Sequence, residues 1–166
     1  MRFHLREFQP ADTTAVNEVA LAAFNEFRHD YDDWTTFSYG ISKMASLAEF
    51  GQLIVATVRD KVAGAVVYVG SGKEKGELFP AEWPIIRMLV VAPPYRGLGI
   101  GHALTEECIQ RAKGDGAPLI ALHTTPIMKV ALPMYERMGF IYEREAPELF
   151  GVPYGIYVKL LATSSS

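Results

Sequence analysis

Runs of apolar, β-branched residues predict the strands of this chain. The runs 52–58 and 62–69 are joined by residues 59–61, a polar turn typical of a β-hairpin. The run 85–91 is apolar on both faces, with Arg87 as its only charge, which is the pattern of a buried strand. Weaker patterns predict further strands at residues 2–8, 118–123, 140–145 and 154–161.

Apolar residues at helical spacing predict helices between these strands. The first helix follows Pro10 and has Asp12 as its N-cap. The second begins within residues 28–38 and runs to about residue 50, and the fourth ends at Gly139, a residue suited to a helix C-terminus. The third carries an apolar stripe formed by Ile100, Leu104 and Cys108.

The resulting order of elements is β-α-α-β-β-β-α-β-α-β-β. This order predicts a mixed sheet flanked by helices, in the α/β (α+β) class. A chain of 166 residues is long enough for one domain with a sizeable core. We expect that domain to span residues 1–161, with residues 162–166 forming a frayed tail.

Composition narrows the classes of function. The chain is 49% hydrophobic and 21% charged, with a formal charge of −3, as in an ordinary globular protein. A general nucleic-acid binder would carry a basic excess, so we expect no nucleic-acid partner. The single cysteine, Cys108, excludes an internal disulfide.

Membrane and secretion signals are missing from the pattern. No apolar run is long enough to span a bilayer, and the first residues lack a signal-peptide core. We therefore expect a cytoplasmic protein with no membrane partner. The sequence leaves the oligomeric state open, with a homodimer among the options.

The segment between the buried strand and the third helix carries the clearest chemistry. Two prolines end the strand, because proline cannot donate to a sheet. Glycines then allow an anion to approach the main chain at the start of a helix, where backbone N–H groups are free. The segment reads Arg96-Gly97-Leu98-Gly99-Ile100-Gly101-His102.

Two common nucleotide motifs do not fit this segment. A P-loop needs Lys and then Ser or Thr after its last glycine, where His102 and Ala103 stand. The dinucleotide motif G-x-G-x-x-G, started at Gly97, needs glycine at His102. The sequence therefore predicts a phosphate site of another kind.

Residues 96–101 resemble the R/Q-x-x-G-x-G/A motif of the GNAT superfamily of acyl-CoA-dependent N-acyltransferases. Residues 131–140 resemble the family's A-x-x-x-Y-x-x-x-G-F signature, with Tyr135 as its tyrosine. The resemblance covers about residues 52–140. It implies a mostly antiparallel sheet with helices on both faces, and acetyl-CoA as the acyl donor without a metal. The cofactor-binding residues that it implies are Leu89, Val90, Val91, Arg96, Gly97, Leu98, Gly99, Ile100, Gly101 and His102.

The resemblance also implies the catalytic groups. The strand that carries Leu89 would separate from its neighbour and offer a backbone N–H to the thioester oxygen. Tyr135 would protonate the leaving thiolate, because a phenol is protonated at neutral pH. The family's strand glutamate is replaced by Ile85, so we expect the base to be Glu82, His123 or a water molecule.

The resemblance places the acceptor between the early helices and the last strands. Phe27, Trp34 and Tyr154 are the candidate substrate-binding residues there, since aromatic walls suit an amine cation. The sequence so indicates an N-acetyltransferase that acts on a small amine, an amino acid or a protein N-terminus by direct attack in a ternary complex. A non-catalytic acyl-CoA sensor and a transferase of longer acyl groups remain open, because Met128 also departs from the family's asparagine.

Overall fold

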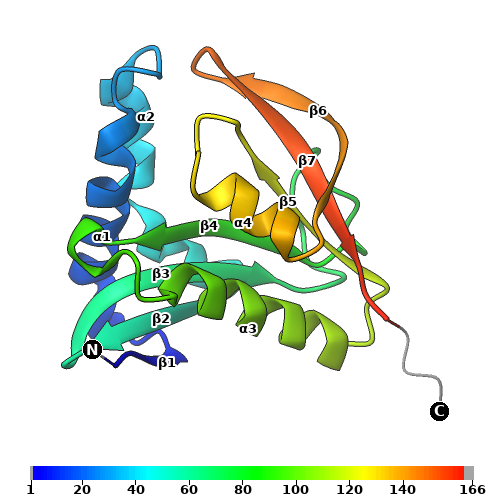
Figure 1. The fold of residues 1–166 in the computed structure, drawn as a ribbon, viewed down its shortest axis with the longest axis horizontal. Helices are drawn as coiled ribbons and strands as arrows, with labels where there is room; N and C mark the ends of the chain where they lie inside the picture. Colours follow the sequence, from blue (N-terminus) through cyan, green and yellow to red (C-terminus); the bar gives the residue numbers. More distant parts are fainter. Residues whose placement is uncertain (1, 163–166) are drawn as a thin grey trace.

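The computed structural model describes residues 2–162, which form one seven-stranded sheet flanked by helices (Figure 1). The sheet order is β1-β2-β3-β4-β5-β7-β6, and within this described part only β4 and β5 pair in parallel. The strands are β1 (His4–Glu7), β2 (Gln52–Val58), β3 (Lys61–Val69), β4 (Ile85–Val91), β5 (Leu119–Thr124), β6 (Ile141–Leu149) and β7 (Val152–Leu160). The helices are α1 (Thr13–Phe24), α2 (Trp34–Ile41), α3 (Ile100–Gly114) and α4 (Ala131–Arg137). The mixed, mostly antiparallel sheet expected from the sequence is confirmed.

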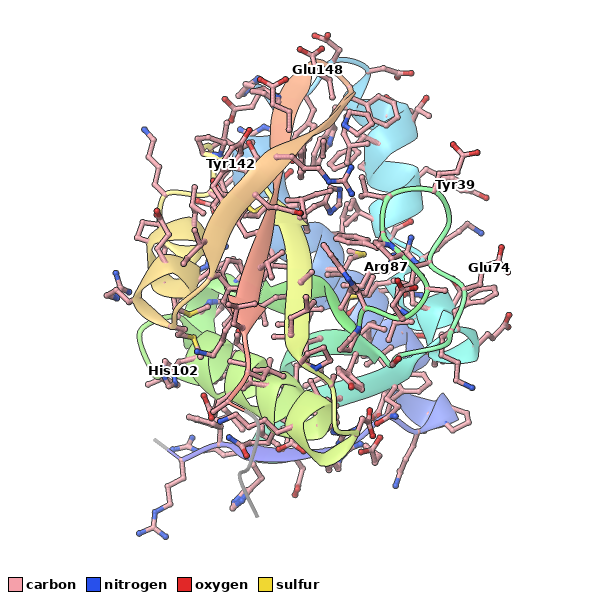
Figure 2. The ribbon with its side chains drawn as sticks, turned by 90° about the vertical axis from the view of Figure 1, so that its right-hand side faces the viewer. Tyr39, Glu74, Arg87, His102, Tyr142 and Glu148 are labelled. Carbon is pink, nitrogen blue, oxygen red and sulfur yellow. The ribbon has the colours of Figure 1, made fainter. Side chains whose placement is uncertain are left out.

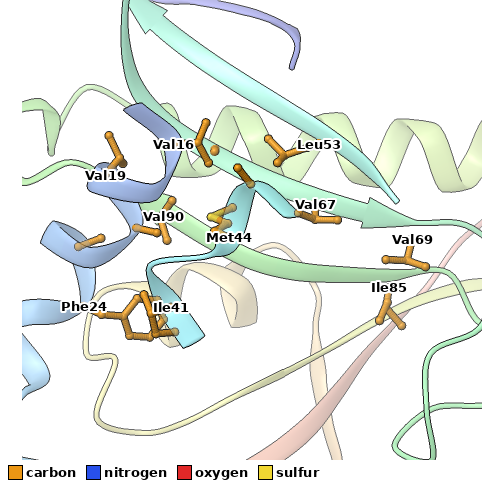
Figure 3. Packing of buried hydrophobic residues seen from close by; sticks show 14 of the residues in the cluster. Val16, Val19, Phe24, Ile41, Met44, Leu53, Val67, Val69, Ile85 and Val90 are labelled. Carbon is orange, nitrogen blue, oxygen red and sulfur yellow. The ribbon is translucent and has the colours of Figure 1, made fainter. Parts of the chain in front are cut away.

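Each face of the sheet has its own apolar core. On one face α1 and α2 cover the strands, and Figure 3 shows Val16 and Leu53 in this cluster. On the other face α3 and α4 pack against the sheet through residues such as Leu104 and Tyr135. Successive side chains of a strand point to opposite faces, which is why β2 and β3 are apolar at nearly every position.

One prediction about the early helices was wrong, and one was confirmed in part. The second helix ends at Ile41 and a separate 3-10 segment follows at Met44–Glu49, because Gly40 and Ser42 favour a helix end. Asp12 lies at the predicted N-cap position of α1, but its side chain accepts no hydrogen bond from the first turn of α1. Its carboxylate accepts hydrogen bonds from the Arg6 guanidinium at 2.8 and 2.9 Å, and from the Gln9 N–H at 2.8 Å across the preceding 3-10 turn.

The last hairpin is longer than the sequence predicts. β6 continues to Leu149 and β7 begins at Val152, since the two strands pair along their whole length around a short turn at Phe150, where φ is +47°. No helix in residues 2–162 is long and apolar enough to cross a membrane. The predicted frayed tail falls largely on residues 163–166, outside the described residues.

Candidate active site

Strands β4 and β5 part from each other soon after they meet. Ile85 and Ala121 are their one register pair in the described structure. Further along β4, Met88 adopts a φ of +50°, and β4 carries one residue more than β3 between the pairs Val67–Arg87 and Ala65–Val90. Such a bulge bends a strand and removes backbone groups from the ladder. The predicted separation of this strand from its neighbour is therefore present, and the bulge lies next to Leu89.

The glycine-rich loop ends in a helix N-terminus with bare N–H groups. Gly97 and Gly99 have φ values of +84° and +89°, which glycine adopts without strain. The first backbone bond of α3 runs from the Ala103 N–H to the Gly99 carbonyl at 3.0 Å. Among the described residues no acceptor engages the N–H groups from Gly97 to His102. These groups fit a phosphate or pyrophosphate.

Gly101 marks the point where β4, α3 and α4 converge. A Cβ added at this glycine would lie 3.7 Å from the Met134 Sδ atom, 3.8 Å from Leu89 Cδ2 and 3.8 Å from Val91 Cγ2. No atom lies within 4 Å of a Cβ added at Gly97 or Gly99. The loop is therefore open on its outer side, where an anion would approach.

Arg96 points toward α1. Its Nη2 atom lies 2.7 Å from the Glu26 carboxylate and 3.3 Å from the carbonyl oxygen of Ala23 in the last turn of α1. The negative end of the helix dipole favours a cation there. The phosphate contact predicted for the Arg96 side chain stays a prediction, because its charge is already partnered by Glu26.

Tyr135 lies on α4 and is buried against α3. Its ring packs edge-on against Phe140, with centroids 5.7 Å apart. Burial raises the pKa of the Tyr135 phenol, with a smaller contribution from Cys108, so the hydroxyl stays protonated at neutral pH. No described residue accepts from this hydroxyl, and no fully buried polar side-chain atom in the described region lacks a partner. The hydroxyl therefore keeps some contact with solvent, as a proton donor to a ligand requires.

His123 lies near the end of β5, on the face covered by α1 and α2. Its ring is 4.9 Å from the Tyr154 ring and 6.4 Å from the Phe79 ring, centroid to centroid. Burial, and secondarily the charge of Arg87, lower its pKa to about 4. The imidazole is therefore neutral at pH 7 and can accept a proton, although a base of this pKa is weak.

Glu82 lies apart from the glycine loop. It is exposed in the segment before β4, and the six residue steps from Ile85 to Val91 span about 20 Å at the rise of a strand. Its charge acts on Lys75, whose Nζ atom donates to the carbonyl oxygens of Gly70, Lys73 and Ala81 at 2.6 to 2.8 Å. The structure thus does not bring Glu82 together with Tyr135 or the glycine loop, and its role as base stays a prediction.

The three predicted substrate-binding aromatics lie in one aromatic cluster. Phe27 and Trp34 are half-buried, and Tyr154 is buried. Tyr31 joins them: its ring lies 6.3 Å from the Trp34 ring, and its hydroxyl is hydrogen-bonded to that of Tyr154. The cluster therefore also holds the segment between α1 and α2 against β7, and contact with an acceptor stays a prediction for all three residues.

Sequence reasoning missed two features of the site. The sequence indicates Arg87 only as the charge of a buried strand, yet its side chain is exposed (Figure 2), and its charge acts on the pKa of His123. The positive φ of Met88 has no local sequence signal, since it arises from the pairing of β4 with β3. In residues 2–162 no group of three His, Cys, Asp or Glu side chains could hold a metal ion.

The GNAT class of acetyltransferases has this architecture: a seven-stranded mixed sheet in which two parallel strands separate beside a helix N-terminus with free N–H groups. The Acetyltransferase (GNAT) family model matches residues 13–140, and this chain belongs to that family. It is 32% identical over 100 residues to the probable N-acetyltransferase camello of Xenopus tropicalis. That alignment covers 60% of this chain and 43% of the relative, so this chain matches less than half of the relative's length.

Solved structures share the fold over nearly the whole chain. Ard1 from Thermoplasma volcanium superposes with a TM-score of 0.77 at 17% identity, covering 98% of this chain and 99% of that one. A GNAT family acetyltransferase from Brucella melitensis, solved in complex with acetyl-CoA, superposes with a TM-score of 0.64 at 21% identity, covering 97% and 89%. At these identities the likeness establishes the common fold.

Proposed function

We propose that this protein transfers an acetyl group from acetyl-CoA to a primary amine. The observation that carries the proposal is the pairing of two features: the bare N–H groups from Gly97 to His102, and the bulge at Met88 where β4 leaves β5. The free N–H groups suit the pyrophosphate of an acyl-CoA. The bulge removes backbone groups of β4 from the ladder, and the rest of the donor can pair with them. Membership of the GNAT family and the acetyl-CoA complex of the Brucella melitensis protein support acetyl-CoA as the donor.

The transfer proceeds by direct attack in a ternary complex. The nitrogen of the neutral amine attacks the thioester carbon, a C–N bond forms and the C–S bond breaks. The backbone N–H near Leu89 stabilises the oxygen that becomes negative. Tyr135 gives its proton to the leaving thiolate, and the proton of the amine passes to His123, Glu82 or water.

A binding measurement followed by an activity screen tests this proposal. Acetyl-CoA should bind in calorimetry, and a panel of amines should then release free thiol from it. Absence of acetyl-CoA binding at millimolar concentration would refute the proposal. A series of acyl-CoA donors with longer acyl groups decides whether the acetyl group is preferred. Faster turnover of a longer acyl-CoA would show that the enzyme transfers a longer acyl group.

One observation favours a second function, a non-catalytic acyl-CoA sensor. Ile85 is buried and apolar where the family often has a glutamate, and the Met128 sulfur accepts a hydrogen bond from the Thr124 hydroxyl at 3.8 Å. Ile85 cannot act as a base, and Met128 cannot make the hydrogen bond that the family's asparagine would give to the donor. Tight binding of acetyl-CoA with no thiol release across the amine panel would support the sensor over the enzyme.

A further inference from the structure

Arg87 and His123 lie side by side where β4 and β5 begin to part. Each stands two residues beyond the register pair Ile85–Ala121 on parallel strands. Side chains two residues apart on a strand share a face, so both point to the face on which Ile85 and Ala121 join the core under α1 and α2. The influence of the Arg87 charge on the pKa of His123 agrees with this placement.

The positive charge of Arg87 has no carboxylate partner among the described residues. Arg6, Arg96, Arg111 and Arg144 each pair with a carboxylate within 4 Å. Arg87 is exposed and makes no ion pair or side-chain hydrogen bond with any other residue of the described chain. Its guanidinium is therefore available to an anion from solution.

Among the described residues, no carboxylate lies within ion-pair distance of Arg87. Burial lowers the pKa of His123 most and the charge of Arg87 lowers it further, so that imidazole is neutral at pH 7. The aromatic rings of Tyr154 and Phe79 also lie beside His123. An anion bound by Arg87 would lie against its positive guanidinium and the neutral side chains beside it. The contact would be a charge-assisted hydrogen bond, partly shielded from water.

We propose that Arg87 binds a carboxylate of the acceptor, so that the acceptor is a free amino acid. This inference rests on the proposed function, since it names the acceptor of that transfer. Arg87 immediately precedes the bulge at Met88, so the anion site and the parted strands lie within one or two residues of each other along β4. An α-amino acid carries its amine and its carboxylate on one carbon and fits this short span. A protein N-terminus has a neutral amide in the place of that carboxylate.

Matched pairs of ligands test the assignment through binding. N-acetyl derivatives of the standard amino acids and the corresponding N-acetyl amides are titrated into the protein in the presence of coenzyme A. At least one acid should bind about tenfold or more tightly than its amide, as expected for a charge-assisted contact. Arg87→Gln should remove the difference, and Arg87→Lys should keep part of it because it keeps the charge.

Arg2→Gln is the matched control, because Arg2 is also exposed and makes no ion pair with a described residue. It should leave the preference unchanged, and all variants should bind acetyl-CoA as the wild type does. Equal binding of acid and amide to the wild type, or equal losses for both in Arg87→Gln, would overturn the inference.

Measurements of turnover distinguish a failure of this inference from a failure of the proposed function. Amino acids should be acetylated faster than their amides, and Arg87→Gln should slow only the amino acids. A preference for the acid in binding with no acetylation of any amine would refute the transferase and leave the anion site standing. Acetylation of amides and amino acids at equal rates would refute the anion site and leave the transferase standing.

Discussion

The hydroxyl groups of Tyr31 and Tyr154 form a buried hydrogen bond between residues 123 positions apart in the sequence. The bond ties the segment between α1 and α2 to strand β7. A second tie runs in parallel from the Asp32 N–H to the Phe150 carbonyl at 2.8 Å. Because the Tyr154 ring also lies against His123, these ties set the position of one wall of the predicted acceptor site.

Removal of either hydroxyl should destabilise the protein. Tyr31→Phe or Tyr154→Phe leaves the other hydroxyl buried without its partner, at a cost of about 1–3 kcal/mol in the free energy of unfolding. The double variant leaves no orphaned hydroxyl, so its loss should be smaller than the sum of the two single losses. Urea unfolding of the four proteins measures this. Additive losses would show that the two hydroxyls do not depend on each other.

Tyr135→Phe should slow the reaction and leave the fold intact. Loss of the proton donor should lower kcat by about 100-fold or more while the KM for acetyl-CoA stays within about twofold. The urea midpoint should not fall, since the hydroxyl has no partner in the described protein. Burial raises the pKa of this phenol, so the wild-type kcat should not decline through its ionisation up to pH 9.

Tyr142→Phe is the control for this variant, because Tyr142 is an exposed tyrosine on β6. Steady-state kinetics and urea unfolding of both variants complete the test. A large rise in the KM for acetyl-CoA in Tyr135→Phe, with kcat preserved, would assign Tyr135 to binding instead of proton transfer.

Acidification should destabilise the protein through His123. The folded state lowers the pKa of this imidazole from 6.5 to about 4, so between these values the unfolded chain binds a proton that the folded chain does not. The contribution to stability is complete above pH 6.5 and is lost as the pH falls toward 4, by up to about 3 kcal/mol.

His123→Gln removes this titration and serves as its control. Urea unfolding at pH 7 and pH 4.5 should show a larger loss of stability for the wild type than for His123→Gln. Equal losses in the two proteins would show that the acid sensitivity comes from other groups.

Local signals in the sequence were enough for most of the fold. The hairpin of β2 and β3, the buried strand β4 and the glycine-rich start of α3 each depend on neighbouring residues, and all three were predicted within a few residues. The bulge at Met88 was not predictable, because it depends on how β4 pairs with β3.

The contacts across the site depend on the order of strands in the sheet. Arg87 and His123 become neighbours only because β4 and β5 are adjacent and parallel. The bond between Arg96 and Glu26 likewise requires α1 to end beside the glycine loop. Motif matching could predict residues for a donor site, whereas the side chains that pair with them, such as Glu26 with Arg96, required the structure.

Gly101→Asp offers the sharpest test of the donor site, with Gly101→Ala as its control, because the family's motif accepts alanine at this position. The added methyl group would lie 3.7 to 3.8 Å from its neighbours, an ordinary contact, and alanine gains up to about 1 kcal/mol in helix propensity, so stability should not fall. The affinity for acetyl-CoA should therefore stay within about twofold in Gly101→Ala, whereas the carboxylate of Gly101→Asp repels the phosphates of the donor at the free N–H groups and should lower that affinity about tenfold or more. Gly114→Ala at the other end of α3 meets no atom within 4 Å and should leave that affinity unchanged. Calorimetric titration of these variants decides the matter: unchanged affinity in Gly101→Asp would place the donor away from this end of α3.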